Sequence, residues 1–185
     1  MFRALATSEI LKHGIAYDSK TTPTSSPEMA LVHLSNLIEK NPDTATAYAY
    51  AWRAMVHEYI GQHPFRNANK DHEKGIALDI DLYISTNKEI NGFLAEYQYK
   101  TMVEWPWHII NRLIIWRGIA YNKTGDYHNA LKTLDLLLEE NGNLLSRSTT
   151  AQAYNLRGQA FLGLGQTELA KQDFLIACDS DRDYC

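Results

Sequence analysis

The stretch WRGIAYNKTGDYHNALKTLDLLLEENG, residues 116–142, decides the fold. It predicts two short amphipathic helices joined by a turn at Thr124-Gly125-Asp126. Each helix carries small or apolar residues at spacings of three and four, which place them on one face. These residues are Ile114, Gly118 and Tyr121 in the first helix and Ala130, Leu134 and Leu137 in the second. Because Gly118 and Ala130 are small, the two backbones can approach closely, so the stretch predicts a tightly packed helical hairpin.

The same hairpin pattern recurs elsewhere in the chain. Leu156-Arg157-Gly158 aligns with Trp116-Arg117-Gly118 at an offset of 40 residues. Further pairs at this offset are Tyr121 and Phe161, Gly125 and Gly165, Ala130 and Ala170, and Leu134 and Phe174. Trp52-Arg53-Ala54 and Gly61 align at an offset of 64, and residues 14–17 repeat the letters GIAY of residues 118–121. The chain therefore predicts four hairpins, near residues 4–41, 42–86, 109–141 and 150–183.

This hairpin resembles the tetratricopeptide repeat, a helix–turn–helix of about 34 residues. Gly118, Tyr121, Ala130 and Leu134 carry the resemblance, because the repeat has a small residue, an aromatic, an alanine and a large apolar residue in that order. The resemblance implies an all-α fold, a right-handed superhelix of about four repeats. Residues 87–105 would be an insertion between the second and third repeats, and residues 1–185 a single domain. No segment alternates as a β-strand does.

The helix signals predict helices near residues 4–18, 27–40, 43–61, 72–86, 88–104, 106–123, 126–140, 149–164 and 166–179. Ser26 and Pro27 suit a helix start, and Ser146 to Thr150 supply capping hydroxyls. Residues 62–74 are polar, carry Pro64 and exceed a normal hairpin turn. We therefore expect this segment to be a mobile loop that proteases prefer.

The composition limits the classes of partner and the cellular location that we expect for the protein. The chain has 185 residues, 45% of them hydrophobic, a net charge of −4 and a pI near 6.0, with scattered basic residues. These values argue against nucleic acid or a membrane as the partner. Residues 1–20 do not read as a signal peptide, and no apolar run approaches the ~20 residues of a membrane span. Cys178 and Cys185 match no metal spacing, and two thiols fit a reducing compartment, so a cytoplasmic location is expected.

In the tetratricopeptide family the first helix of each repeat forms a concave binding face. The resemblance therefore implies a non-catalytic scaffold that binds another protein or peptide, as an adaptor, a secretion chaperone or a toxin-neutralising protein. The expected partner-binding residues are Tyr48, Met55, Tyr59, Arg112, Ile115, Ile119, Asn122, Asn155 and Gln159. Whether this groove is open or filled by the insertion stays undecided at the sequence level. Chaperone-binding members hold a ligand ending in Glu-Glu-Val-Asp with Lys and Asn, but Leu11, Ile15, Ala51 and Met55 occupy those places here.

Two alternatives remain. One is a self-assembling structural protein, in which an end repeat docks on its twin to form a homodimer. The other is a metal-dependent enzyme that uses the region from His57 to His72, although the spacing from His57 to His63 does not fit the H-E-x-x-H zinc motif. The sequence predicts no catalytic residue, no metal site and no cofactor.

Charged residues also allow two interpretations. Arg53, Arg117 and Arg157 each precede the small residue of a first helix. They are either a row of anion-binding groups or, as their repetition favours, structural partners of nearby acids. The acidic residues Asp179, Asp181 and Asp183 predict a frayed tail.

Overall fold

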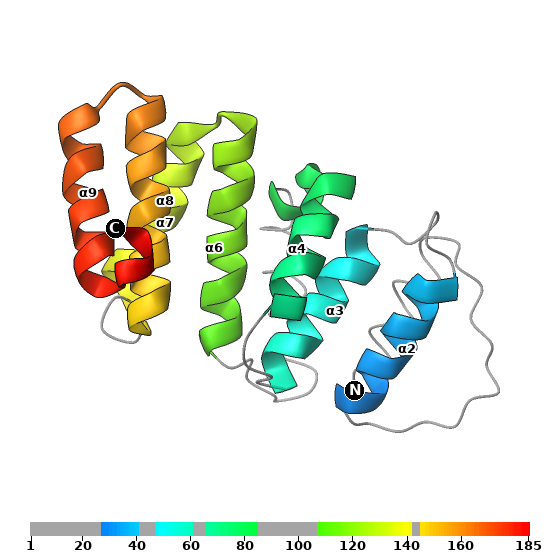
Figure 1. The fold of residues 1–185 in the computed structure, drawn as a ribbon. Coiled ribbons are helices and arrows are strands. Elements are labelled where there is room, and N and C mark those ends of the chain that lie inside the picture. The colour runs from blue at the N-terminus through cyan, green and yellow to red at the C-terminus, as the bar shows by residue number, and fades with distance from the viewer. Residues whose placement is uncertain (1–26, 41–46, 61–65, 85–106, 142–144) are drawn as a thin grey trace. The chain divides into compact units, whose positions relative to one another are not determined.

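The structure is a computed structural model that describes residues 27–40, 47–60, 66–84, 107–141 and 145–185 (Figure 1). The chain divides into two compact units, residues 1–82 and residues 83–185. The single domain expected over 1–185 stays a prediction. Helices predicted at 4–18 and 88–104 lie outside the described residues, as does the turn glycine Gly61.

All elements of the described segments are helical. The first unit contains α2 (Pro27–Lys40), α3 (Ala47–Ile60) and α4 (Arg66–Leu78), and each packs on the next. The second contains α6 (Trp107–Thr124), α7 (Tyr127–Asn141), α8 (Arg147–Gly163), α9 (Thr167–Ser180) and the 3-10 helix η2 (Arg182–Tyr184). In this unit, too, each helix packs on the next one along the chain, and α6 also contacts α8. The all-α prediction is therefore confirmed for the part of the chain that the structure describes.

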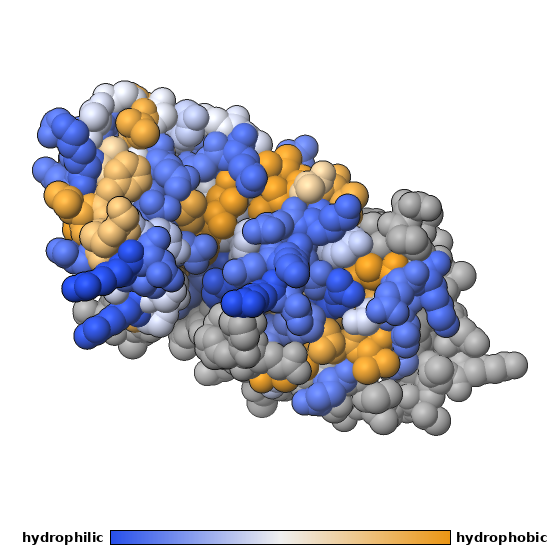
Figure 2. All heavy atoms as spheres, viewed as in Figure 1, coloured by the Kyte–Doolittle hydropathy of each residue, from blue (hydrophilic) through white to orange (hydrophobic). Residues whose placement is uncertain are grey.

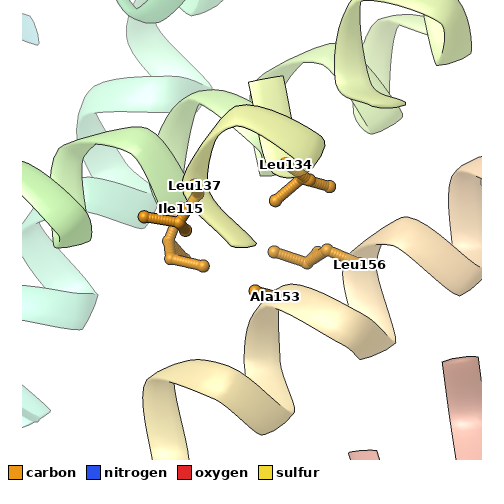
Figure 3. Packing of buried hydrophobic residues seen from close by; sticks show 5 residues of the cluster. All are labelled: Ile115, Leu134, Leu137, Ala153 and Leu156. Carbon is orange, nitrogen blue, oxygen red and sulfur yellow. The ribbon is translucent and has the colours of Figure 1, made fainter. Parts of the chain in front are cut away.

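The core of the second unit lies where α6, α7 and α8 meet. Figure 3 shows five buried side chains that converge there from the three helices. They are Ile115 from α6, Leu134 and Leu137 from α7, and Ala153 and Leu156 from α8. Ile115, Leu134 and Leu137 are completely buried. Burial of an aliphatic side chain of this size contributes about 1.5–3 kcal/mol, so this cluster holds two successive hairpins together.

Small residues create the close helix contacts that the repeat pattern predicts. A Cβ atom on Gly118 would lie 3.0 Å from Cδ2 of Leu134, and a Cβ on Gly158 would lie 2.7 Å from Cε1 of Phe174. Ala130 is completely buried and Ala170 is 1% exposed. The predicted tight contact is thus confirmed in both hairpins of the second unit.

The turns of these two hairpins are built alike. Gly125 and Gly165 have φ angles of 76° and 75°, in the left-handed region that favours glycine. In the first turn Asp126 N donates to Tyr121 O over 3.0 Å, and in the second Gln166 N donates to Phe161 O over 2.8 Å. The 40-residue offset in sequence is therefore an offset in backbone structure as well.

The predicted loop at 62–74 is wrong over residues 66–74, because α4 occupies residues 66–78. The buried face of α4 consists of Ala68, Asp71, His72, Gly75 and Ile76, at helical spacing. Two of these five residues are polar and one is glycine, so the apolar periodicity that signals a helix is absent. Charged partners on α3, described below, explain how the polar residues are tolerated.

Candidate partner-binding face

The partner-binding residues predicted on α6 divide into buried and accessible ones. Ile115 is completely buried in the core, which leaves it no surface for a partner. Ile119 is partly buried against the same cluster. Arg112 is partly exposed, and its guanidinium lies 6.0 Å from the centroid of the Trp116 ring. Asn122 has a structural contact, because its Nδ2 donates to the carbonyl oxygen of Leu156 on α8 over 2.9 Å.

The equivalent line on α8 is more accessible. Gln152 and Asn155 are partly exposed and Gln159 is exposed, at spacings of three and four residues. Leu162 continues the line and is 53% exposed. The first-helix face is defined here as the accessible residues of both lines, which are Arg112, Ile119, Asn122, Gln152, Asn155, Gln159 and Leu162.

The amides on α8 differ from Asn122 in their bonding. Within the described part of the chain, the side chains of Gln152, Asn155 and Gln159 make no hydrogen bond. A primary amide offers two N–H donors and a carbonyl acceptor. Three such groups in a row along one helix can pair with the main chain of an extended ligand.

The residues predicted in the first unit are placed less favourably for binding. Met55 is 4% exposed and therefore belongs to the core of that unit. Tyr59 is partly exposed. The side chain of Tyr48 lies outside what the structure describes. Met55 and Ile115 are accordingly dropped from the proposed face, while the other predicted residues keep that status as predictions.

The repeated arginines have structural partners in two of the three hairpins. Arg157 of α8 binds Asp173 of α9 with two hydrogen bonds of 2.7 and 2.8 Å, and its Nη1 donates to Asp135 of α7 over 2.8 Å. The hydrogen bond with Asp173 is the main cause that raises the pKa of the Arg157 guanidinium. Arg53 of α3 binds Asp71 of α4 in the same bidentate manner, with both distances 2.7 Å. Pairing with acids explains this repeated geometry better than a row of anion-binding groups does, because Asp173 and Asp71 are buried.

Arg117 departs from this pattern. The residue 16 positions later is Thr133, where Arg157 has Asp173. Arg117 Nη2 instead donates to the hydroxyl of Tyr121 over 3.3 Å, and the Arg117 guanidinium lies 5.4 Å from the centroid of the Tyr121 ring. Sequence reasoning missed the acids Asp71, Asp135 and Asp173. An acid 16–18 residues after the arginine is the signal that could have found two of them.

The described residues of the region from His57 to His72 include a buried polar pair. Glu58 of α3 and His72 of α4 are both completely buried, and Glu58 Oε1 lies 3.4 Å from His72 Nε2. Among the described residues, no three His, Cys, Asp or Glu side chains are grouped to hold a metal ion. His63 lies outside that part of the chain. The pair gives His72 a structural role in joining α3 and α4.

The C-terminal residues are ordered and do not form the frayed tail that was predicted. A disulfide joins Cys178 near the end of α9 to Cys185, so the two cysteines are not the free thiols expected from the sequence. Asp181 leaves α9 with an extended backbone, and its side chain accepts a hydrogen bond from Asp183 N over 3.1 Å. The intervening η2 packs against α9 and α8 (Figure 1). An acidic residue here therefore caps the 3-10 helix.

None of the helices in the described segments combines the length and apolar character that a membrane span requires.

Comparison with known families identifies the C-terminal hairpin. Residues 151–184 match the family model for the tetratricopeptide repeat, a span that covers most of α8, all of α9 and η2. Neither a curated protein nor a solved structure matches the chain. Tetratricopeptide repeats in general mediate binding between proteins and are typical of non-catalytic proteins. The tight Gly158 contact, the left-handed turn at Gly165 and this match together show that the chain carries a tetratricopeptide repeat motif at residues 151–184.

Proposed function

We propose that this protein is a non-catalytic scaffold that binds a protein or peptide partner on the first-helix face. The observation that carries the proposal is the row formed by Gln152, Asn155 and Gln159. These amides are at least partly exposed, and none of them is engaged within the described residues. Their spacing follows one side of α8, where the repeat match provides a general role in protein binding.

The chemistry of this face suits an extended segment of polypeptide. The amides on α8 would bind its main-chain N–H and C=O groups, while Ile119 and Leu162 would contact its apolar side chains. Arg112 at one end of the face would attract a carboxylate. The face holds one cation in seven residues, which does not suit nucleic acid or an anionic membrane.

Finer features of the sequence interpretation belong to the same proposal. Four repeats would form a right-handed superhelix with an insertion at 87–105, and Tyr48 and Tyr59 would contribute to partner binding within the first unit. A cytoplasmic adaptor, secretion chaperone or toxin-neutralising protein would use such a surface. The repeat match supports the protein-binding role in general and leaves the particular role as our inference.

Site-specific photo-cross-linking tests the face directly. The photoreactive residue p-benzoylphenylalanine replaces Gln159 in one variant and Gln172 in a matched control. Both glutamines are exposed, but Gln172 lies on α9, outside the first-helix face. We expect irradiation in the native cell lysate to give a discrete protein adduct at Gln159 and none at Gln172. Adducts at Gln172 alone, or at neither position, would contradict the proposal.

Exposed apolar residues on α9 favour self-assembly as a second candidate function. Leu175 is 67% exposed, Leu169 44% and Ile176 40%. Figure 2 shows hydrophobic residues reaching the viewed surface among hydrophilic ones. Homodimer formation through α9 would cover them. Light scattering over a range of protein concentrations tests this, since Leu175→Glu should return a dimer to the monomer mass, whereas a monomeric parent protein would exclude it.

A further inference from the structure

Arg117 of α6 and Arg157 of α8 present their guanidinium groups in the same way. Each group lies over the aromatic ring four residues later in its helix, 5.4 Å from the centroid of Tyr121 and 5.8 Å from that of Phe161. The glycine that follows each arginine closely contacts the second helix of its hairpin. The two arginines therefore hold equivalent places, and their surroundings can be compared position by position.

The two hairpins differ in the group that faces the arginine from the second helix. Asp173 is buried and accepts hydrogen bonds from Nε and Nη2 of Arg157, over 2.7 and 2.8 Å. Thr133 occupies the equivalent position in α7 and carries no negative charge. No carboxylate among the residues that the structure describes pairs with Arg117. The first hairpin of this unit thus has the arginine of the pair without its acid.

The missing acid leaves hydrogen-bond donors of Arg117 unused. Its Nε is buried and has no acceptor within the described part of the chain, although the same atom of Arg157 donates to Asp173. A buried N–H group without an acceptor costs free energy, because its bond to water is lost and nothing replaces it. An arginine does not relieve this cost by losing its proton. The bond from Arg117 Nη2 to the Tyr121 hydroxyl is 3.3 Å long, which is longer than either bond to Asp173.

We propose that Arg117 is a binding site for a carboxylate from a partner protein, supplied by an aspartate or glutamate side chain. The carboxylate would take the place against Arg117 that Asp173 takes against Arg157. The planar guanidinium matches two carboxylate oxygens, and the chain itself uses this match at Arg157 and at Arg53. These internal examples favour a carboxylate over a phosphate as the anion. Arg117 is partly exposed, so the residue is not sealed inside the protein.

This site is separate from the first-helix face. Arg117 lies five residues from both Arg112 and Asn122 in the sequence. Five residues turn an α-helix by about 140° beyond a full turn, which places Arg117 on another side of α6. The inference therefore goes beyond the proposed function, and the cross-linking result at Gln159 does not decide it.

Side-chain NMR of the full chain tests the site, because each arginine Nε–H group gives its own signal. The signal of Arg117 is the one that disappears in Arg117→Lys. The labelled protein is titrated with N-acetylglutamate N-methylamide and, in parallel at the same ionic strength, with the glutamine analogue. We expect the glutamate probe alone to shift the Arg117 signal in a saturable manner. The Arg157 signal should stay in place, because Asp173 already binds that group.

Two outcomes of this titration would overturn the proposal. One is an Arg117 signal that the glutamate probe leaves unmoved. The other is an equal shift with the glutamine probe, which would show that the negative charge is not recognised. Both outcomes are measured on the parent protein and do not depend on how any variant folds.

A pair of substitutions on α7 tests where the carboxylate binds. Thr133→Asp supplies an internal acid at the position equivalent to Asp173, whereas Thr133→Asn adds a side chain of the same size without the charge. We expect Thr133→Asp to abolish the response of Arg117 to the glutamate probe and to raise the thermal midpoint above that of Thr133→Asn. Thr133→Asn should keep the response, and circular dichroism should show the parent helical spectrum for both. A Thr133→Asp protein that responds as strongly as the parent would overturn the assigned position of the ligand.

Discussion

Gly158 lies so close to Phe174 that a Cβ atom on the glycine would be 2.7 Å from the phenyl ring. The equivalent pair in the preceding hairpin, Gly118 and Leu134, would give 3.0 Å to the flexible end of a leucine. The two contacts occupy equal positions in the repeat but differ in how easily the neighbour can move.

Substitution of these glycines measures that difference. Gly158→Ala should lower the free energy of unfolding by about 1–3 kcal/mol, because the rigid ring has to shift. Gly118→Ala should cost less, since a leucine rotamer can adjust and alanine favours a helix. Urea denaturation of both variants provides the measurement. Equal costs at the two positions would contradict the packing described for Phe174.

The alanine of the second helix offers a related test. Ala130 is completely buried where α7 meets its neighbours, so Ala130→Leu should overpack the contact and cost about 1–3 kcal/mol of stability. Lys132→Leu adds a leucine at an exposed position of the same helix and is the control. Thermal denaturation should show a lower midpoint for the first variant alone. If the Ala130→Leu protein melts at the same temperature as its parent, the assigned position of the repeat is wrong.

The two acids that bind Arg157 should contribute unequally. Asp173 is buried, so Asp173→Asn weakens a charge-assisted pair shielded from water and should cost about 1–3 kcal/mol. The Asp135 side chain is 42% exposed, and Asp135→Asn should cost less than about 1 kcal/mol. Urea denaturation at low and at high salt separates the cases, because salt screens the exposed pair more strongly. A larger loss of stability in Asp135→Asn than in Asp173→Asn would contradict this ranking of the two acids.

The buried pair of Glu58 and His72 in the first unit should contribute to the stability of the fold, and a substitution tests this. Glu58→Ala removes a completely buried carboxylate beside His72 and should lower stability by about 1–3 kcal/mol. Glu73→Ala changes an exposed glutamate on α4 and should stay within about 0.5 kcal/mol of the parent. Hydrogen exchange over residues 66–78 reports the local effect. Exchange there that is fast already in the parent would contradict the presence of α4.

The sequence predicted the second unit well because its repeats use the expected residue types. The 40-residue offset predicts the close contacts at Gly158 and Ala170 and the turn at Gly165, and the structure has them at these positions. The first part of α4, residues 66–71, was missed for a physical reason, whereas residues 72–78 fall within the helix predicted at 72–86. Asp71 and His72 fill its buried face, and only their partners on α3 make such burial tolerable.

The binding face was predicted less completely than the fold. Helical periodicity shows which residues share a side of a helix, but it does not show which neighbouring helix covers that side. Ile115 illustrates this limit, because it shares a side of α6 with Arg112 but is buried by α7 and α8. The pairing of Cys178 with Cys185 was equally hidden, since it depends on the backbone reversal after Ser180.

Arg157 belongs to two hairpins at once, because its guanidinium holds Asp135 on α7 and Asp173 on α9. Repeat proteins often lose their units one after another from an end, since each contacts only its neighbours. A shared guanidinium works against such stepwise loss. If α9 were peeled away by a pulling force, Arg157 would lose its buried carboxylate, and the cost would fall on the interface with α7 as well. The segment from α7 to α9 should therefore resist force as one mechanical unit.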